Sequence, residues 1–303
     1  MNRQAEVASR GRFSLSPKDW AETSKYRLRA AAQSIAIHLV LAVLLILFML
    51  PILWMLSTSL KPASQVELRP PQWIPSPFNW VNFADFWGYA SFDSGLLNSA
   101  IMTFGAMIGV FFSGPFVAFG FARLQFDGRN FLFVVVLATM MLPAQVTLIP
   151  LYIIYKNIGW LNTFYPFIVP SFLGGGAFFI FLLRQFFLTI PVELEDAARI
   201  DGCNAFRIFA QIFLPLSKPV LATIGIFSFI NGWNDFFGPL IFLSSPKMMP
   251  VTVVLATFKD LEGGIQYNLV MAAAFVAVLP CLAVFFIFQE HLVGGIAISG
   301  LKG

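Results

Sequence analysis

Apolar residues are gathered into six long runs that are separated by polar links. The runs cover roughly 34–60, 96–122, 130–155, 164–183, 219–243 and 268–289. Each is about 20 residues or longer, which is the length of helix that crosses the hydrocarbon core of a bilayer. Only the fifth run contains an acid or a base, Asp235. The pattern predicts an all-α membrane protein with six transmembrane helices.

Composition supports a membrane protein over a soluble domain. Of the 303 residues, 58% are hydrophobic and only 11% are charged, which is unlike a soluble globular chain. Cys203 and Cys281 show neither disulfide nor metal-site spacing, and we interpret them as packing residues. The net charge of +4 includes a basic amino-terminal segment mixed with acids. We therefore expect contact with membrane lipid and no nucleic-acid partner.

The basic residues predict the orientation. With six crossings both chain ends lie on one side, and that side carries fourteen of the 19 Lys and Arg residues. The other five are Lys61, Arg69, Lys156, Lys247 and Lys259. Because basic flanks are retained in the cytoplasm, we expect a cytoplasmic segment at 1–33, a six-span domain at 34–290 and a cytoplasmic tail at 291–303.

Proline and glycine mark the links and interrupt the runs. The external link 61–95 is rich in Pro and Trp, so we expect it to lie at the membrane surface as an aromatic belt or to meet an outside partner. Several apolar runs contain helix breakers, and broken helices at membrane depth suit a translocation path. These breakers are Pro51, Pro115, Pro143, Pro150, Pro170, Pro239, Pro280 and Gly174-Gly175-Gly176. Gly105 and Gly109 form a small-xxx-small pair that permits close helix contact.

The link between the fourth and fifth runs is the longest charged segment after the amino terminus. From Pro191 to Pro219 it reads PVELEDAARIDGCNAFRIFAQIFLPLSKP. Pro191 suits a first helical position, and the acids that follow favour a helix start. Asp201-Gly202 then interrupts the pattern, and phenylalanines recur at helical spacing beyond it. Two short helices joined by a glycine turn are predicted.

The spacing of this link resembles the EAA loop of ABC importer permeases: Asp196-Ala197-Ala198, three residues, Gly202, nine residues, then Ile212 to Pro215. An ordinary amphipathic loop is the alternative, but it does not require fixed spacing. The wider sequence is similar to the carbohydrate-uptake branch, in particular the shorter, six-span maltose-permease subunit. Asp196 stands where the motif usually has glutamate, so the charge is kept on a shorter arm.

This resemblance implies a type I ABC importer permease fold in which the loop 184–218 carries the cytoplasmic coupling helix, which docks on an ATPase subunit. The residues that it assigns to coupling are Glu195, Asp196, Ala197, Ala198, Asp201, Gly202, Phe206 and Pro215.

A second resemblance lies in the fifth run, where Asn231-Gly232-Trp233-Asn234-Asp235-Phe236 looks like the W-N-D-F signature of sugar permeases. Two roles are open for Asn231, Trp233, Asn234 and Asp235. Either they line the outer mouth of a substrate path, where amide and carboxylate oxygens accept hydrogen bonds from sugar hydroxyls, or they fix this span against a partner permease or an external loop.

The function implied by the resemblance is a permease subunit of an ATP-driven sugar or oligosaccharide importer in a bacterial or archaeal cytoplasmic membrane. Its implied partners are a second permease subunit, two ATPase subunits and an external substrate-binding protein. The chain has no GxxxxGK[ST] loop and no metal-site spacing. We therefore expect no catalytic residue, no bound cofactor and no metal, with ATP and Mg held by the ATPase partners.

Other functions fit the sequence less well. A stand-alone secondary transporter or channel would be expected to show several intramembrane ionisable groups or an inverted repeat, and one acid is poor support. A membrane-embedded enzyme lacks a catalytic constellation in the apolar runs. An importer for a non-sugar solute such as glycerol phosphate stays open as an alternative.

Overall fold

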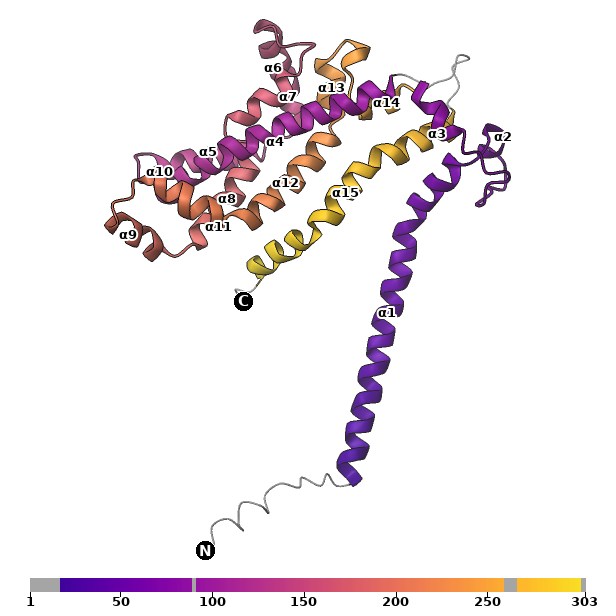
Figure 1. Ribbon diagram of the computed structural model, residues 1–303, viewed down its shortest axis with the longest axis horizontal. Coiled ribbons are helices and arrows are strands. Elements are labelled where there is room, and N and C mark those ends of the chain that lie inside the picture. Colours follow the sequence, from indigo (N-terminus) through magenta and orange to yellow (C-terminus); the bar gives the residue numbers. More distant parts are fainter. Residues whose placement is uncertain (1–16, 89–90, 259–265, 301–303) are drawn as a thin grey trace, which may run out of the picture. The chain divides into compact units, whose positions relative to one another are not determined.

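The computed structural model describes residues 17–88, 91–258 and 266–300, with side chains described for 31–88, 91–258 and 266–290. The described residues form helices and no strand. The chain divides into two compact units, Met1–Met55 and Leu56–Gly303. The first unit contains most of helix α1 (Pro17–Ser59), and the second contains the other helices (Figure 1).

Four long helices dominate the second unit: α4 (Phe92–Arg123), α8 (Ala177–Thr189), α12 (Lys218–Trp233) and α15 (Tyr267–Gly300). Helix α4 packs against α8 and α12, and α12 also packs against α15 (Figure 1). The shorter elements are α2 (Ala63–Val66), α3 (Asn82–Asp85), η1 (Phe86–Gly88), α5 (Arg129–Thr139), α6 (Ala144–Asn157), α7 (Tyr165–Ile168), η2 (Val169–Phe172), α9 (Val192–Ile200), α10 (Ala205–Ile208), η3 (Phe209–Phe213), α11 (Leu214–Leu216), α13 (Phe237–Phe242), η4 (Pro246–Met248) and α14 (Val251–Ala256).

The described residues contain four helices that are long and apolar enough to cross a membrane, or up to six if each of two bent helix pairs is one span. The third predicted run is one of these pairs, because α5 and α6 meet at 101°. The break contains Pro143, which lacks an N–H donor and disfavours a helical residue before it. The run predicted at 130–155 is therefore two helices.

The fifth run is also interrupted. Helix α12 ends at Trp233, before α13 begins at Phe237. A further bend of 73°, between the segment α10 to α11 and α12, lies just before the run. Proline at position 239 cannot donate to the carbonyl four residues earlier, that of Asp235, and its ring crowds that carbonyl. The expectation that Asp235 lies within a continuous helix over 219–243 is therefore corrected: it lies in the break after α12.

The two ends of the chain are more helical than the hydrophobic pattern indicates. Helix α1 begins at Pro17, within the polar segment assigned to 1–33, and α15 continues to Gly300, within the tail assigned to 291–303. A helix can extend past a membrane surface with charged residues on it. The apolar run therefore predicts which residues cross the membrane, but it does not predict where the helix begins or ends. The rest of both assigned segments, 1–16 and 301–303, lies outside the described residues.

The predicted close contact of the second span is present. A Cβ atom on Gly109 would lie only 2.9 Å from backbone atoms of Ser171 and Phe172. Helix α4 therefore approaches η2 at a distance that a side chain would prevent. A Cβ atom on Gly105 would instead lie 2.8 Å from the side chain of Ile168. The pair thus places α4 directly against the broken fourth run.

Two clusters of buried side chains hold the second unit together. In one, Phe119 of α4, Phe187 of α8 and Phe213 of η3 pack edge to face, with ring centroids 5.0 to 6.4 Å apart. In the other, Phe92 at the start of α4 packs with Trp233 at the end of α12, and with α14 and α15. Helix α12 contributes to both clusters, which fixes its two faces.

The link assigned to 61–95 folds onto the beginning of α15. The Asn82 side chain is buried, and its amide nitrogen donates to the carbonyls of Ser59 and Lys61 at 2.8 Å each. Its oxygen accepts from the amide nitrogen of Asn268 at 3.0 Å. Burial lowers the pKa of the Lys61 amine. Part of this link is therefore anchored to the helices, while Trp73, Trp80 and Trp87 stay exposed.

Candidate functional site

The first candidate region is the glycine-turned segment, Val192–Leu216. We predicted that Pro191 would be the first helical residue, but helix α9 begins at Val192, so Pro191 lies one residue before the helix. The helix ends in a two-bond glycine turn, in which Gly202 N–H donates to Arg199 O at 3.0 Å and Cys203 N–H donates to Ala198 O at 2.9 Å. Gly202 has φ +80°, the left-handed conformation typical of this C-terminal motif. The predicted pair of helices with a glycine turn is confirmed.

The second helix of the segment starts at a capped residue. The side-chain oxygen of Asn204 accepts from the backbone N–H of Arg207 at 2.9 Å, which satisfies a free donor at the start of α10. The glycine turn and the asparagine cap together set the direction of α10 relative to α9. A π-helical stretch, η3, then leads into α11.

Glu195 anchors the segment to the rest of the chain. It is only 5% exposed, and it contacts Arg199 at 2.7 Å and the Nε atom of Arg123 at 3.9 Å. Arg123, the last residue of α4, also donates to the carbonyls of Phe187 and Ile190 at the end of α8. A buried carboxylate requires such partners. The assigned coupling residue Glu195 therefore faces inward.

Most other assigned coupling residues face outward. Asp196, Ala197, Asp201, Phe206 and Pro215 are exposed, whereas Ala198 is buried behind Glu195. The exposed side chains include large apolar ones, with Ile200 at 87% and Phe206 at 66% exposure, and also Val192, Leu194 and Leu216. An apolar surface of this kind is typical of a site for another protein.

The second candidate region is a cavity of about 520 Å³ where α4, α6, α12 and α13 come together; we name it the polar cavity after the few polar side chains that enter it. Apolar residues form most of its wall, and Tyr155, Phe167 and Phe237 add aromatic faces. Its lining residues are Met102, Ala106, Val110, Ala144, Gln145, Thr147, Leu148, Leu151, Tyr155, Pro166, Phe167, Ser171, Gly175, Phe179, Ser228, Asn231, Gly232, Asp235, Phe237, Gly238 and Phe242. A mostly apolar cavity with a few convergent polar groups is typical of a small-molecule site.

The four residues assigned to the substrate path or an interhelical contact divide between two faces. Asn231 and Asp235 line the cavity. Trp233 faces α15, where its Nε1 atom donates to the carbonyl of Ala277 at 3.0 Å. Asn234 donates to Ile230 O at 2.9 Å and approaches Cys281 of α15. Asn231 and Asp235 therefore face the cavity, whereas the side chains of Trp233 and Asn234 contact α15 or their own helix.

The cavity contains polar residues that sequence reasoning did not single out. Gln145 enters from α6, and Ser228 lies one turn before Asn231 on α12. The side chains of Gln145, Ser228 and Asn231 make no hydrogen bond within the described part of the chain. Ser228 shares a helix face with Asn231, a signal that the sequence already held. Nothing local predicts that Gln145 meets them.

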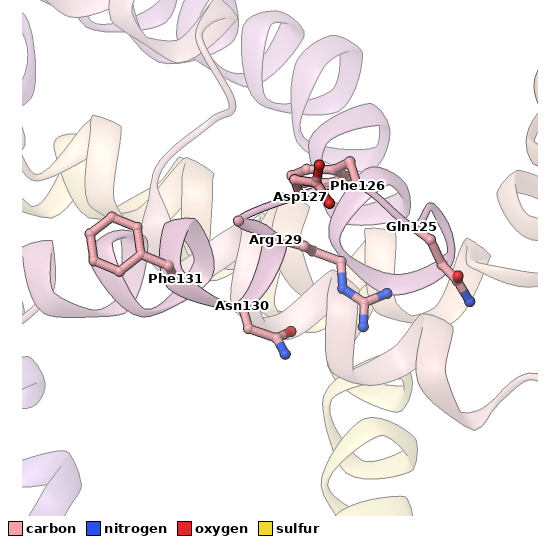
Figure 2. A pocket seen from close by; sticks show the side chains of 7 residues that line it. Gln125, Phe126, Asp127, Arg129, Asn130 and Phe131 are labelled. Atoms are coloured by element: carbon pink, nitrogen blue, oxygen red, sulfur yellow. The ribbon is translucent and has the colours of Figure 1, made fainter.

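A smaller concave surface, lined by Gln125 to Phe131, lies at the turn between α4 and α5 and the start of α5 (Figure 2). Asp127 precedes Gly128, which has φ +81°, and Arg129 donates to the carbonyl of Leu124 at 3.1 Å. Asp127-Gly128 thus repeats the acid-glycine pair of the glycine-turned segment at a second helix junction.

Comparison with known proteins gives consistent matches. The family described as "Binding-protein-dependent transport system inner membrane component" matches residues 114–298. The arabinooligosaccharides transport system permease protein AraQ of Bacillus subtilis (strain 168) is 32% identical over 274 residues, 89% of this chain and 96% of AraQ. The sn-glycerol-3-phosphate transport system permease protein UgpE of Yersinia pestis bv. Antiqua (strain Antiqua) is 34% identical over 270 residues, 87% of this chain and 95% of UgpE.

A solved structure shows the same fold. A chain from the crystal structure of a bacterial ABC transporter involved in the import of the acidic polysaccharide alginate aligns with a TM-score of 0.75 and 22% identity, covering 86% of this chain and 96% of that one. The arrangement is therefore that of a type I ABC importer permease.

Proposed function

The chain belongs to the family of inner membrane components of binding-protein-dependent transport systems, the permease subunits of ABC importers, and from that premise we propose that its solute is a sugar or a short oligosaccharide. As a transporter component it is not a catalytic enzyme. The similarity to AraQ, a protein named for arabinooligosaccharides, supports this choice of solute.

The observation that carries the proposal is the chemistry of the polar cavity. The amides of Gln145 and Asn231 and the hydroxyl of Ser228 have unused hydrogen-bonding capacity, and sugar hydroxyls both donate and accept. Phe167 and Phe237 also line the cavity, where an aromatic ring can pack against the apolar side of a sugar ring. In this role Asn231 and Asp235 line the path, and Trp233 and Asn234 hold α12 against α15.

The glycine-turned segment is proposed to dock on an ATPase subunit. Its exposed apolar side chains give a surface for another protein, and the internal contacts of Glu195 transmit a displacement of α9 to the ends of α4 and α8. ATP and Mg would then be held by two ATPase partners, and solute would be delivered by an external substrate-binding protein. A second permease subunit would complete the translocation path.

Both ends of the chain are proposed to lie in the cytoplasm, on the basis of the fourteen-to-five division of basic residues. Single cysteines at Ser76 and Ser245 should react with an impermeant thiol reagent added to intact cells, after Cys203 and Cys281 are replaced by serine. A cysteine at Ala205 should react only after the cells are opened. Reaction at Ala205 in sealed cells would reverse the orientation.

The proposed function is tested by transport. The chain would be reconstituted in liposomes with its partner permease, ATPases and binding protein, and uptake of radiolabelled arabinotriose would be measured with and without ATP. ATP-dependent uptake is expected. A complex that takes up sn-glycerol 3-phosphate and no neutral sugar would support the second candidate, which the identity to UgpE keeps open. Uptake without the ATPases would support a stand-alone transporter.

A further inference from the structure

We propose that Asp235 makes the polar cavity a charge filter, which repels anions and therefore commits this importer to uncharged sugars instead of phosphate esters or uronates. The inference rests on the proposed function and narrows its substrate class. Relatives of this chain include proteins named for neutral arabinooligosaccharides and for sn-glycerol 3-phosphate, so the family alone leaves the charge of the solute open.

Three polar residues on one side of α12 and in the break after it line the cavity. Ser228, Asn231 and Asp235 are three and four residues apart, so they follow one face through the last turns of α12 and into the break. Trp233 and Asn234 do not line the cavity. Trp233 donates to a carbonyl of α15, and Asn234 donates to a carbonyl of α12 itself. The carboxyl group is thus placed beside the groups that are free to bind a solute.

The backbone holds Asp235 at this position. Its Oδ1 atom accepts from the backbone N–H of Gly238 at 3.2 Å, which caps the start of α13. Its own carbonyl accepts from the hydroxyl of Thr252 at 2.7 Å. The first contact orients the carboxyl group and the second holds the backbone of Asp235 in the break between α12 and α13; neither supplies a positive charge.

No cation in the described part of the chain offsets this charge. The lining residues, all of them described, include Asp235 and no Lys, Arg or His. The two ion pairs among the described side chains both involve Glu195. A cavity with low-dielectric walls and one sign of charge focuses its field on whatever enters. A second negative charge ~7 Å away, at an effective dielectric of ~20, would be disfavoured by at least ~10-fold.

The charge of the cavity can be measured without knowing the solute. A reporter cysteine at Gln145 would be placed in the assembled importer in membrane vesicles, with Cys203 and Cys281 replaced by serine. The probes are two methanethiosulfonates of similar size, one carrying a trimethylammonium group and the other a sulfonate. The ratio of their reaction rates reports the local potential, and any preference of the binding protein has no influence on it.

With Asp235 present the cationic probe should react faster, and Asp235→Asn should lower the ratio at least ~10-fold. Asp127→Asn is the matched control, because it removes an acid from the α4–α5 turn (Figure 2) and should leave the ratio unchanged. If Asp235→Asn does not assemble, Asn231→Asp, which adds a carboxylate to the same face, should raise the ratio.

An equal ratio in the presence and absence of Asp235, or no effect of Asn231→Asp, would overturn the inference, as would a cysteine at Gln145 that reacts with neither probe. The reaction requires no transport, so failure of arabinotriose uptake with the charge effect intact would overturn the proposed function alone. Conversely, uptake of sn-glycerol 3-phosphate as fast as that of arabinotriose would overturn the charge filter and leave the chain an importer subunit.

Discussion

The glycine-turned segment and the polar cavity both lie where helices are interrupted, yet they leave opposite kinds of group without a partner. In the segment the buried charge of Glu195 is paired with Arg123 and Arg199, and large apolar side chains such as Ile200 face outward. In the cavity apolar atoms form the wall, and polar groups such as Asn231 face inward without a hydrogen bond in the described part of the chain.

This difference indicates what each region binds. Exposed apolar side chains gain most when another protein covers them, whereas polar groups that line a mostly apolar cavity can bind a solute rich in hydroxyls. One region is therefore suited to a protein partner and the other to a small molecule. Three variants test this division, each with a control that leaves the other region intact.

The largest effect is expected for Gly202→Asp. Nothing lies within 4 Å of the position that its Cβ would take, but φ +80° disfavours any side chain, so the variant should insert and fail to present α10 for docking. Uptake should be abolished while the amount of inserted protein stays normal, as measured by flux and by immunoblotting of membranes.

Gly128→Asp is the control for this variant. Gly128 resembles Gly202 in three respects: its φ is +81°, nothing lies within 4 Å of the position of its Cβ, and an aspartate precedes it. It should cause a similar backbone strain and little loss of uptake. Equal losses in the two variants, or normal transport and normal ATPase stimulation in Gly202→Asp, would contradict the docking role.

A smaller effect is expected for Glu195→Gln, which removes the charge that pairs with Arg123 and Arg199. The loss of charge-assisted contacts should lower the free energy of unfolding by about 2 kcal/mol, measured by denaturant titration in detergent, and should weaken ATPase stimulation. Glu193→Gln removes an exposed charge from the same turn and should have almost no effect. Equal stability of Glu195→Gln and the parent chain would show that the buried pair does not anchor α9.

The smallest effect separates the two faces of α12. Asn231→Ala should raise the KM for sugar uptake by about 5-fold, because it removes one hydrogen bond of about 1 kcal/mol from the cavity. Asn234→Ala should leave KM unchanged, because its amide donates to Ile230 O of its own helix. The reverse result, with altered KM only in Asn234→Ala, would move the solute path to the face beside α15.

The sequence by itself determined the membrane class, the approximate positions of the apolar spans and the helix-turn-helix around Gly202. These features depend on local properties: the length of an apolar run, the conformational freedom of glycine, and the periodicity of a helix. Proline was an unreliable guide to the breaks. Pro143 and Pro239 lie at or just after interruptions, whereas Pro51, Pro115, Pro150 and Pro280 lie inside continuous helices, and the pattern did not say that Asp235 would lie outside α12.

Only the tertiary structure decided which way the functional side chains face. Arg123 contacts the buried Glu195 from the end of α4, and Gln145 of α6 lines the same cavity as Asn231 of α12. Helical periodicity shows which residues share a face, but the neighbour that covers the face comes from distant parts of the chain. Adjacent residues of one motif, such as Asn234 and Asp235, were therefore turned toward different neighbours by packing.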